Sequence, residues 1–161
     1  MKYSILLDNI RSLHNVGSIF RTADGAWFEK IFLTGYTPTP PRKEIAKTAL
    51  WAEKSVLWEY YEDPREIIST LKKEGTLIIS IEQATSSTGN IQKYLEDNSK
   101  NICIIMGNEI NGVSKDLLDL SDVIFELPMQ GIKQSLNVSV TAGIVMYYIW
   151  YFARQKNWEI S

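Results

Sequence analysis

The sequence predicts an α/β protein built around a parallel β-sheet. Apolar runs of strand length alternate with segments of helical periodicity along the chain. The expected strands are apolar on nearly every residue, which is typical of parallel strands that helices cover on both faces. Because 161 residues can bury one core, we expect a single domain over residues 1–161.

The first half of the chain contains three expected strands and three expected helices. The strands span residues 3–8, 30–35 and 55–60, and the helices span residues 15–25, 42–54 and 63–74. Asn15 is the expected cap of the first helix and Gly25 its stop signal. Asp63 and Pro64 suit the start of the third helix. The prolines of segment 37–41 predict a loop.

The second half repeats this alternation. Its expected strands span residues 76–82, 101–107 and 122–128, and its expected helices span residues 90–97, 114–120 and about 135–156. Ligands of open α/β sheets bind at the carboxyl ends of the strands. This rule points to the loops at residues 8–15, 82–89, 107–114 and 127–137.

The composition excludes several kinds of site. The lone Cys103 cannot form an internal disulfide and gives no cysteine-based zinc site. The single His14 leaves little for metal ligation or for a Ser-His-Asp triad, so no metal is expected. No apolar run approaches the roughly 18 residues that span a bilayer, and no signal peptide is evident. We therefore expect a soluble, cytoplasmic protein without a membrane partner.

The formal charge of -2 is unevenly distributed. Residues 1–60 carry 8 Lys or Arg against 6 Asp or Glu, and residues 61–161 carry 9 against 13. A site for a polyanion should therefore draw on the first part of the chain. A solvated surface of mixed charge explains the same distribution. The candidates for polyanion binding are Arg11, Arg21, Arg42, Lys43 and Lys47.

The segment "GNEINGVSK" (107–115) resembles a phosphate-binding P-loop but lacks its lysine. Val113 holds the lysine position, and Lys115 comes two residues late. Glu109 would also place a negative charge inside a phosphate cradle. This loop suits a hydroxyl-rich or cationic ligand better than a nucleoside triphosphate.

Two other loops carry candidate polar side chains. In "HNVGSIFRTADG" (14–25), Gly17 permits close approach of another segment, and Arg21 is either a functional group or an exposed helix arginine. In "LPMQGIKQSLNVSVTAG" (127–143), Ser135 and Asn137 stand at the expected start of the last helix. Either could cap it, but both together exceed what one cap needs.

Segments 14–25, 104–115 and 127–144 resemble, in order, the three motifs of the SpoU/TrmH family of SPOUT RNA methyltransferases. The resemblance extends over roughly Asp8 to Arg154, and "SLNVS" with its upstream Pro-Met and glycine is its most specific part. It implies a parallel-sheet SPOUT fold whose C-terminal segment forms a deep trefoil knot. Patterning alone would not suggest a knot, because true knots are rare.

The resemblance also implies a pocket for S-adenosylmethionine, formed by the second and third motifs. Family members hold this cofactor in a bent shape, largely through backbone groups. The positions of this chain that match are Gly107, Leu127, Met129, Ser135 and Leu136, together with Ala84 or a neighbour.

The implied reaction is methyl transfer to a ribose 2′-hydroxyl of RNA, with tRNA favoured over rRNA. Arg21 is the matching catalytic residue, either as a base or as a group that stabilises the developing alkoxide. The second role is favoured because the pKa of arginine exceeds about 12. Asn15 would orient Arg21 or the ribose. Glu109, Ser135 and Asn137 would complete a polar wall.

The family forms homodimers in which the arginine of one chain faces the cofactor of the other. In this chain, segment 143–152 is apolar or aromatic on nearly every side. A surface helix needs only one apolar stripe, so the surplus suggests a homodimer through the C-terminal helix. A fully buried core helix explains the same pattern.

Two departures from the family bear on RNA recognition. Trp51 stands where many relatives have small residues, and it either stacks a base or fills space. We also expect no appended RNA-binding domain, so the RNA would be chosen by the domain surface or by a helper protein. The rival hypotheses are a catalytically silent RNA-binding module and a base-modifying SPOUT enzyme, whose motifs differ from "SLNVS".

Overall fold

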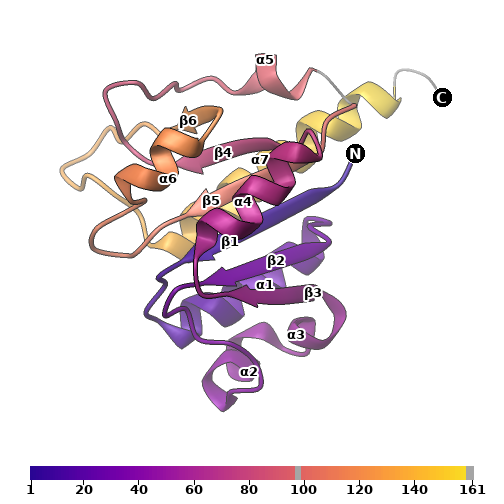
Figure 1. Ribbon diagram of the computed structural model, residues 1–161, viewed down its shortest axis with the longest axis vertical. Helices are drawn as coiled ribbons and strands as arrows, with labels where there is room; N and C mark the ends of the chain where they lie inside the picture. The colour runs from indigo at the N-terminus through magenta and orange to yellow at the C-terminus, as the bar shows by residue number, and fades with distance from the viewer. Residues whose placement is uncertain (97–98, 159–161) are drawn as a thin grey trace.

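The computed structural model describes residues 1–96 and 99–158 and contains one six-stranded sheet with the order β3-β2-β1-β5-β4-β6 (Figure 1). All of its strand pairs are parallel, as the sequence predicts. The strands are β1 (Tyr3–Asp8), β2 (Lys30–Thr34), β3 (Leu57–Tyr61), β4 (Leu77–Ile81), β5 (Ile102–Met106) and β6 (Val123–Phe125). The helices are α1 (Leu13–Gly25), α2 (Lys43–Ala49), α3 (Ala52–Ser55), α4 (Pro64–Lys73), α5 (Gln92–Leu95), α6 (Lys115–Leu120) and α7 (Val138–Trp158).

The helices form a layer on each face of the sheet. Figure 1 shows α4 in front of the sheet and α7 behind it. On one face, side chains of α4 and α6 pack with Leu6, Phe32 and Cys103 of the strands. On the other face, α1, α5 and α7 share a larger core with Ile5 and Ile104, and α2 and α3 add to it beside α1. Buried strands in the middle of the sheet explain their continuous apolar sequence.

The predicted helix over residues 42–54 is wrong in one respect, because it breaks at Leu50 and Trp51. Both residues adopt left-handed backbone conformations, with φ of 50° and 77°. The break turns the chain away from α2 and toward the sheet edge at β3. It leaves Leu50 54% and Trp51 72% exposed. Leucine is a good helix former, so no local signal predicts this break.

The start of α1 also corrects a prediction. Ser12, not Asn15, is the N-cap, and its side-chain oxygen accepts a hydrogen bond from the Asn15 backbone N–H at 3.2 Å. Gly17 permits the close approach expected of it. A β-carbon there would lie 2.0 Å from Thr48 Oγ1 and 2.3 Å from the Ile45 carbonyl oxygen of α2.

Two further helices differ at their ends from the prediction. The last helix begins at Val138 and not at Ser135, because Asn137 caps it through its side-chain oxygen and the Ser139 N–H at 2.8 Å. Segment 126–137 is therefore a long loop. The predicted helix over 90–97 is shorter, Gln92–Leu95, and residue 97 lies outside the described residues. Asp63 and Pro64 begin α4 as predicted.

Helix α7 is buried on one side and exposed on the other. Its buried residues include Ala142, Val145, Met146 and Ile149. Its exposed apolar residues are Val140, Ile144, Tyr147 and Tyr151. Their spacing of four, three and four residues places these four on one face, the α7 outer face. No helix in the described part of the chain is long and apolar enough to cross a membrane.

Candidate cofactor cavity and RNA-facing surface

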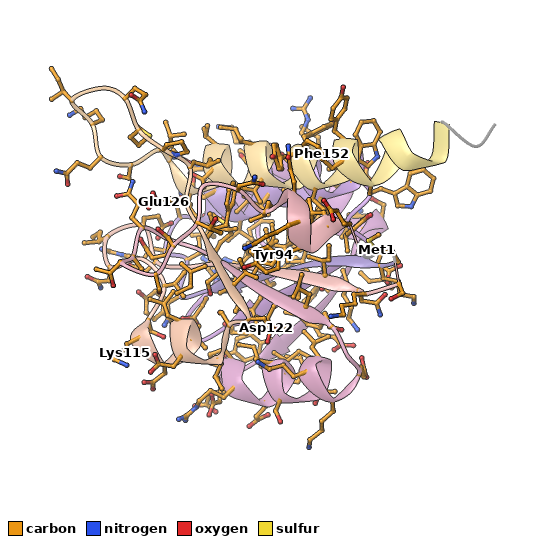
Figure 2. The ribbon with its side chains drawn as sticks, turned by 90° about the horizontal axis from the view of Figure 1, so that it is seen from above. Met1, Tyr94, Lys115, Asp122, Glu126 and Phe152 are labelled. Atoms are coloured by element: carbon orange, nitrogen blue, oxygen red, sulfur yellow. The ribbon has the colours of Figure 1, made fainter. Side chains whose placement is uncertain are left out.

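A cavity of about 310 Å³ opens at the carboxyl ends of β4, β5 and β6. Three segments surround it, namely residues 81–83, 106–112 and 126–141. Figure 2 shows Glu126 at the foot of the 126–137 loop, which stands away from the body of the molecule. Three of the four loops that the sheet rule selected therefore meet at one place, because parallel strands end at the same edge, whereas the 8–15 loop does not line the cavity.

The 107–112 loop closes on itself through backbone contacts. Asn108 N–H donates to the Gly112 carbonyl at 3.1 Å, and Gly112 N–H donates to the Asn108 carbonyl at 2.9 Å. A β-carbon on Gly107 would lie 2.3 Å from Gly112 backbone atoms. Gly112 has a φ of 68°, and a β-carbon there would meet the Glu82 carboxylate. The two glycines thus serve backbone packing and not a phosphate cradle.

Asn108 joins this loop to the neighbouring strand end. Its buried side-chain amide donates to the Asn9 carbonyl at 2.9 Å and to the Tyr36 hydroxyl at 2.8 Å. Its side-chain oxygen accepts from the Ile110 and Asn111 N–H groups at 2.9 Å. The sequence prediction did not single out Asn108, although an asparagine just after an apolar strand, at the end of the sheet where ligands bind, is a signal that could have found it.

Glu109 fastens the second motif to the first. Its carboxylate accepts hydrogen bonds from Arg11 N–H at 2.9 Å, Ser12 N–H at 3.0 Å and the Asn15 side-chain amide at 3.2 Å. Burial acts to raise the pKa of Glu109, but these backbone N–H groups outweigh it and hold the pKa below its ordinary value. The structure therefore brings Asn15 and Glu109 together, with Glu109 ionised at neutral pH.

The segment after β4 is hydrogen-bonded to the 126–137 loop. Gln83 donates from its side-chain amide to the Gln134 carbonyl at 2.8 Å. The Glu126 N–H donates to the Thr88 carbonyl at 3.1 Å, and the Ser87 hydroxyl donates to the Glu126 carboxylate at 2.7 Å. These contacts hold the 126–137 loop at the cavity, where Glu126, Leu127 and Met129 are half-buried and the other residues of the loop are exposed.

Most of the residues predicted for the cofactor and the polar wall line this cavity. Ala84 does not line it, but its neighbour Gln83 does. The predicted residues that line it are Gly107, Glu109, Leu127, Met129, Ser135, Leu136 and Asn137. The lining residues that sequence analysis did not single out include Ile81, Glu82, Asn108, Ile110, Glu126 and Thr141.

The charge of the cavity is negative. Glu82, Glu109 and Glu126 contribute to its wall, and no Lys or Arg is among its described lining residues. Such a wall favours a ligand with positive charge and hydroxyl groups over a phosphate. Within residues 1–96 and 99–158, no group of three His, Cys, Asp or Glu is placed to hold a metal ion.

Arg21 lies outside the cavity of its own chain. It is exposed on α1 and makes no hydrogen bond or ion pair with the part of the chain that the structure describes. Gly25, about one helical turn after Arg21, lies against Tyr147 of the α7 outer face, because a β-carbon on Gly25 would lie 2.8 Å from the Tyr147 hydroxyl oxygen. Arg21 is thus positioned near the α7 outer face.

The predicted RNA-binding cations lie in two separate regions of the molecule. Arg42, Lys43 and Lys47 lie together beside α2 and line a groove of about 710 Å³. Arg11 precedes α1, and Arg21 lies on α1, so neither lines that groove. Lys43 and Lys47 lie four residues apart on one face of α2, and Arg42 is the N-cap residue of that helix.

The chain is similar to known proteins over most of its length. The tRNA (guanosine(18)-2'-O)-methyltransferase of Aquifex aeolicus is 29% identical over 144 residues, which cover 89% of this chain and 66% of that protein. The chain thus spans just under two thirds of the length of this relative.

Solved structures are similar over almost the whole chain. The crystal structure of the A. aeolicus TrmH/SpoU tRNA modifying enzyme matches with a TM-score of 0.84 and 26% identity, covering 97% of this chain and 77% of that one. The SpoU methyltransferase AviRb from Streptomyces viridochromogenes, in complex with the cofactor AdoMet, matches with a TM-score of 0.82. It is 20% identical, covers 95% of this chain and 60% of its own, and supports the fold alone.

The family model described as the SpoU rRNA Methylase family matches residues 2–147. The match includes all three motif segments and every residue that lines the cavity. The chain belongs to the SpoU rRNA Methylase family.

Proposed function

We propose that this protein transfers a methyl group from S-adenosylmethionine to a ribose 2′-hydroxyl of RNA. The observation that carries the proposal is the acidic cavity formed by the second and third motif segments in a chain of this family. The relative from A. aeolicus is named for this reaction on tRNA, which favours tRNA over rRNA as the substrate.

The cavity suits the proposed cofactor in shape and charge. Ile81, Met106, Leu127 and Met129 provide apolar walls, and the backbone of the 107–112 loop provides polar groups. The acidic wall attracts the positive sulfonium and ammonium groups. When bound, S-adenosylmethionine supplies a methyl group that forms a bond to the ribose oxygen as the carbon–sulfur bond breaks, while the hydroxyl proton passes to water or a phosphate.

Arg21 would stabilise the negative charge that develops on the ribose oxygen. Its guanidinium is exposed and unpaired among the described residues, so it is available to an RNA oxygen. The pKa of arginine exceeds about 12, which makes it a poor base at neutral pH. Ser135 has a hydroxyl at the cavity and could contact the ribose, whereas Asn15 and Asn137 mainly hold Glu109 and the start of α7.

A homodimer would bring Arg21 to a cavity. Arg21 does not line the cavity of its own chain but lies near the α7 outer face. A second copy docked on Val140, Ile144, Tyr147 and Tyr151 would cover apolar surface that a monomer leaves in water. The partner's cavity would then lie opposite Arg21, so each active site would use two chains.

The deep trefoil knot of the family is part of the same proposal. The chain passes from α6 on one face of the sheet, through β6 and the 126–137 loop, to α7 on the other face. On this path it contacts the segment after β4 through Gln83 and Thr88. A crossing of this kind supports a threaded C-terminal segment. A single domain and a cytoplasmic location stay predictions.

The test uses labelled S-adenosylmethionine with tRNA and rRNA from a strain that lacks this protein. Wild type and Arg21→Ala are compared, and the digested RNA is analysed for 2′-O-methyl nucleosides. We expect label in one nucleoside, with a rate that falls by roughly 10²-fold or more in Arg21→Ala. Lys73→Ala, which changes an exposed cation of α4, serves as the control.

Two results would contradict the proposed reaction, and a third would change the role of Arg21. Label on a base nitrogen would identify a base-modifying enzyme. Equal rates for wild type and Arg21→Ala would remove Arg21 from the chemistry. Measurable cofactor binding without label in any RNA would favour the silent module.

A further inference from the structure

The groove beside α2 and α3 combines cations with aromatic surface. It has a volume of about 710 Å³ and lies between Pro40, Pro41, both short helices and Trp58 of β3. Four of its described lining residues are cations, namely Arg42, Lys43, Lys47 and Lys54, and one is acidic, Glu53. A chain with a net charge of -2 thus gathers a local excess of positive charge here.

The cations of the groove are available to a ligand. Arg42, Lys43 and Lys47 are exposed, and none forms an ion pair with the described residues. This differs from Lys72 and Lys115, which pair with Asp122 and Asp119. Unpaired lysines and an arginine in one groove attract phosphate groups and release counterions when these bind.

Trp51 presents an exposed aromatic ring at the same groove. Its indole is 72% exposed, and Lys54 Nζ lies 4.0 Å from the ring centroid. The ring is held outward by the left-handed conformations of Leu50 and Trp51, with φ of 50° and 77°. Large residues rarely adopt this conformation, and such strain is retained where the exposed side chain is used. A side chain that only fills space would be buried, and Trp51 is not.

Glu53 restricts how a nucleotide could lie in the groove. Its Oε2 atom is buried and accepts no hydrogen bond from the described residues. An anionic oxygen there repels a phosphate, so phosphates belong at the rim with Arg42, Lys43 and Lys47. A base is uncharged and meets no such repulsion. The groove is thus arranged for a base inside and phosphates outside.

We propose that the groove between α2, α3 and β3 is a docking site for an unpaired nucleotide of the RNA, with its base stacked on Trp51 and its phosphates on the α2 cations. The inference deepens the proposed function and rests on RNA being the substrate. Every base has a π-face, so stacking on an exposed tryptophan tolerates any sequence and requires only that the base be unstacked from its neighbours.

The groove would position the RNA and take no part in the chemistry. It lies at the β3 edge, whereas the cavity lies at β4, β5 and β6, on the other side of β1 and β2 in the sheet order. A substrate that reaches both places must extend across the sheet. RNA has that reach, and the excess of cations favours a polyanion over a neutral peptide.

The experiment measures binding of a labelled 12-nucleotide single-stranded RNA and of a duplex of the same length to the full chain. We expect Trp51→Ala to weaken single-strand binding about tenfold and to leave duplex binding unchanged. Trp51→Phe keeps an aromatic ring and should retain most of the affinity. Cofactor affinity, measured by calorimetry, should equal that of wild type in both variants, which controls for folding.

The cations are tested by the dependence of binding on salt. Lys43→Ala/Lys47→Ala should reduce the slope of log affinity against log salt by about 0.7 for each phosphate that the variant no longer neutralises. Lys73→Ala is the matched control, because Lys73 is exposed on α4 on the opposite face of the sheet. It should leave the slope unchanged.

The outcomes separate this inference from the proposed function. Equal single-strand affinity in wild type and Trp51→Ala, or equal losses on single strand and duplex, would overturn the docking site and leave an acidic protein as the occupant. If wild type methylates RNA in that case, the proposed function still stands. If Trp51 binds the single strand but no RNA is methylated, the docking site stands and the methyltransferase proposal falls.

Discussion

The cavity and the groove differ in charge and in the way they are built. The cavity wall carries Glu82, Glu109 and Glu126 and is shaped by backbone contacts between loops. The groove carries Arg42, Lys43, Lys47 and Lys54 on the surface of two short helices. The first region is shaped by backbone packing, and the second by exposed side chains. A net charge near zero therefore conceals two surfaces of opposite sign.

The difference also appears in how each region tolerates change. A β-carbon at Gly107 or Gly112 of the cavity meets backbone atoms or a fixed carboxylate. The side chains of Lys43, Lys47 and Trp51 are exposed, and their removal leaves the core intact. Substitutions should thus disturb folding at the cavity and only binding at the groove.

The largest expected effect concerns which chain of a dimer supplies Arg21 to each cavity. Arg21→Ala and Ser135→Trp, whose ring would occupy the cavity, should each be nearly inactive as a homodimer. Mixed dimers restore one complete site, so an equal mixture after subunit exchange should recover about one quarter of wild-type activity. Methylation assays before and after exchange measure this. Continued inactivity of the mixture would show that Arg21 serves the cavity of its own chain.

The next effect concerns the backbone packing of the cavity. Gly107→Ala places a methyl group 2.3 Å from the Gly112 backbone and should destabilise the fold by about 2–3 kcal/mol. Cofactor binding should be lost with it. Urea denaturation and calorimetry provide the two measurements. Gly131→Ala is the control, because a β-carbon at Gly131 meets nothing within 4 Å. Similar losses in both variants would contradict the packing argument.

A smaller effect concerns the hydrogen bonds by which Glu109 connects the second motif to the first. Glu109→Gln weakens hydrogen bonds from Arg11 and Ser12 and should cost about 1 kcal/mol at neutral pH, since the carboxylate is partly exposed. Folding lowers the pKa of Glu109 below its ordinary 4.5, so its contribution is present above that pH and is lost as pH falls through the folded value.

Urea denaturation at pH 7 and at about pH 3 checks this pH dependence. The difference in stability between wild type and Glu109→Gln should narrow in acid. A difference that stays constant over this range would show that the carboxylate charge contributes nothing to the bond between the motifs.

The smallest effect concerns the strained residue of the groove. Trp51→Gly and Trp51→Ala both remove the ring, but only glycine adopts a φ of 77° without steric cost. The glycine variant should be more stable than the alanine variant by somewhat less than about 1 kcal/mol, because glycine also gains entropy when unfolded. Thermal unfolding measures the difference. A more stable alanine variant would show that the conformation is not strained.

Much of the fold and the cavity could be predicted from the sequence. The six strands and their parallel arrangement follow from apolar runs and helical periods, which are local properties. The positions Gly107, Leu127, Met129, Ser135 and Leu136 came from motif resemblance, and the structure brings them together at one cavity. The predicted helix over 42–54 and the Asn15 cap failed, because packing of α2 on α1 and the contact with Glu109 override local preference.

The sequence by itself determined the fold class, the family motifs and the lack of a P-loop lysine, because each depends on residue types at fixed spacing. Only the tertiary structure decided that Glu109 ties two motifs together and that Arg21 lies outside the cavity of its own chain. It alone also placed Trp51 beside the α2 cations. The first two facts depend on contacts between segments distant in sequence, which no local pattern encodes. The third depends on the helix break at Leu50 and Trp51, which local propensity does not predict.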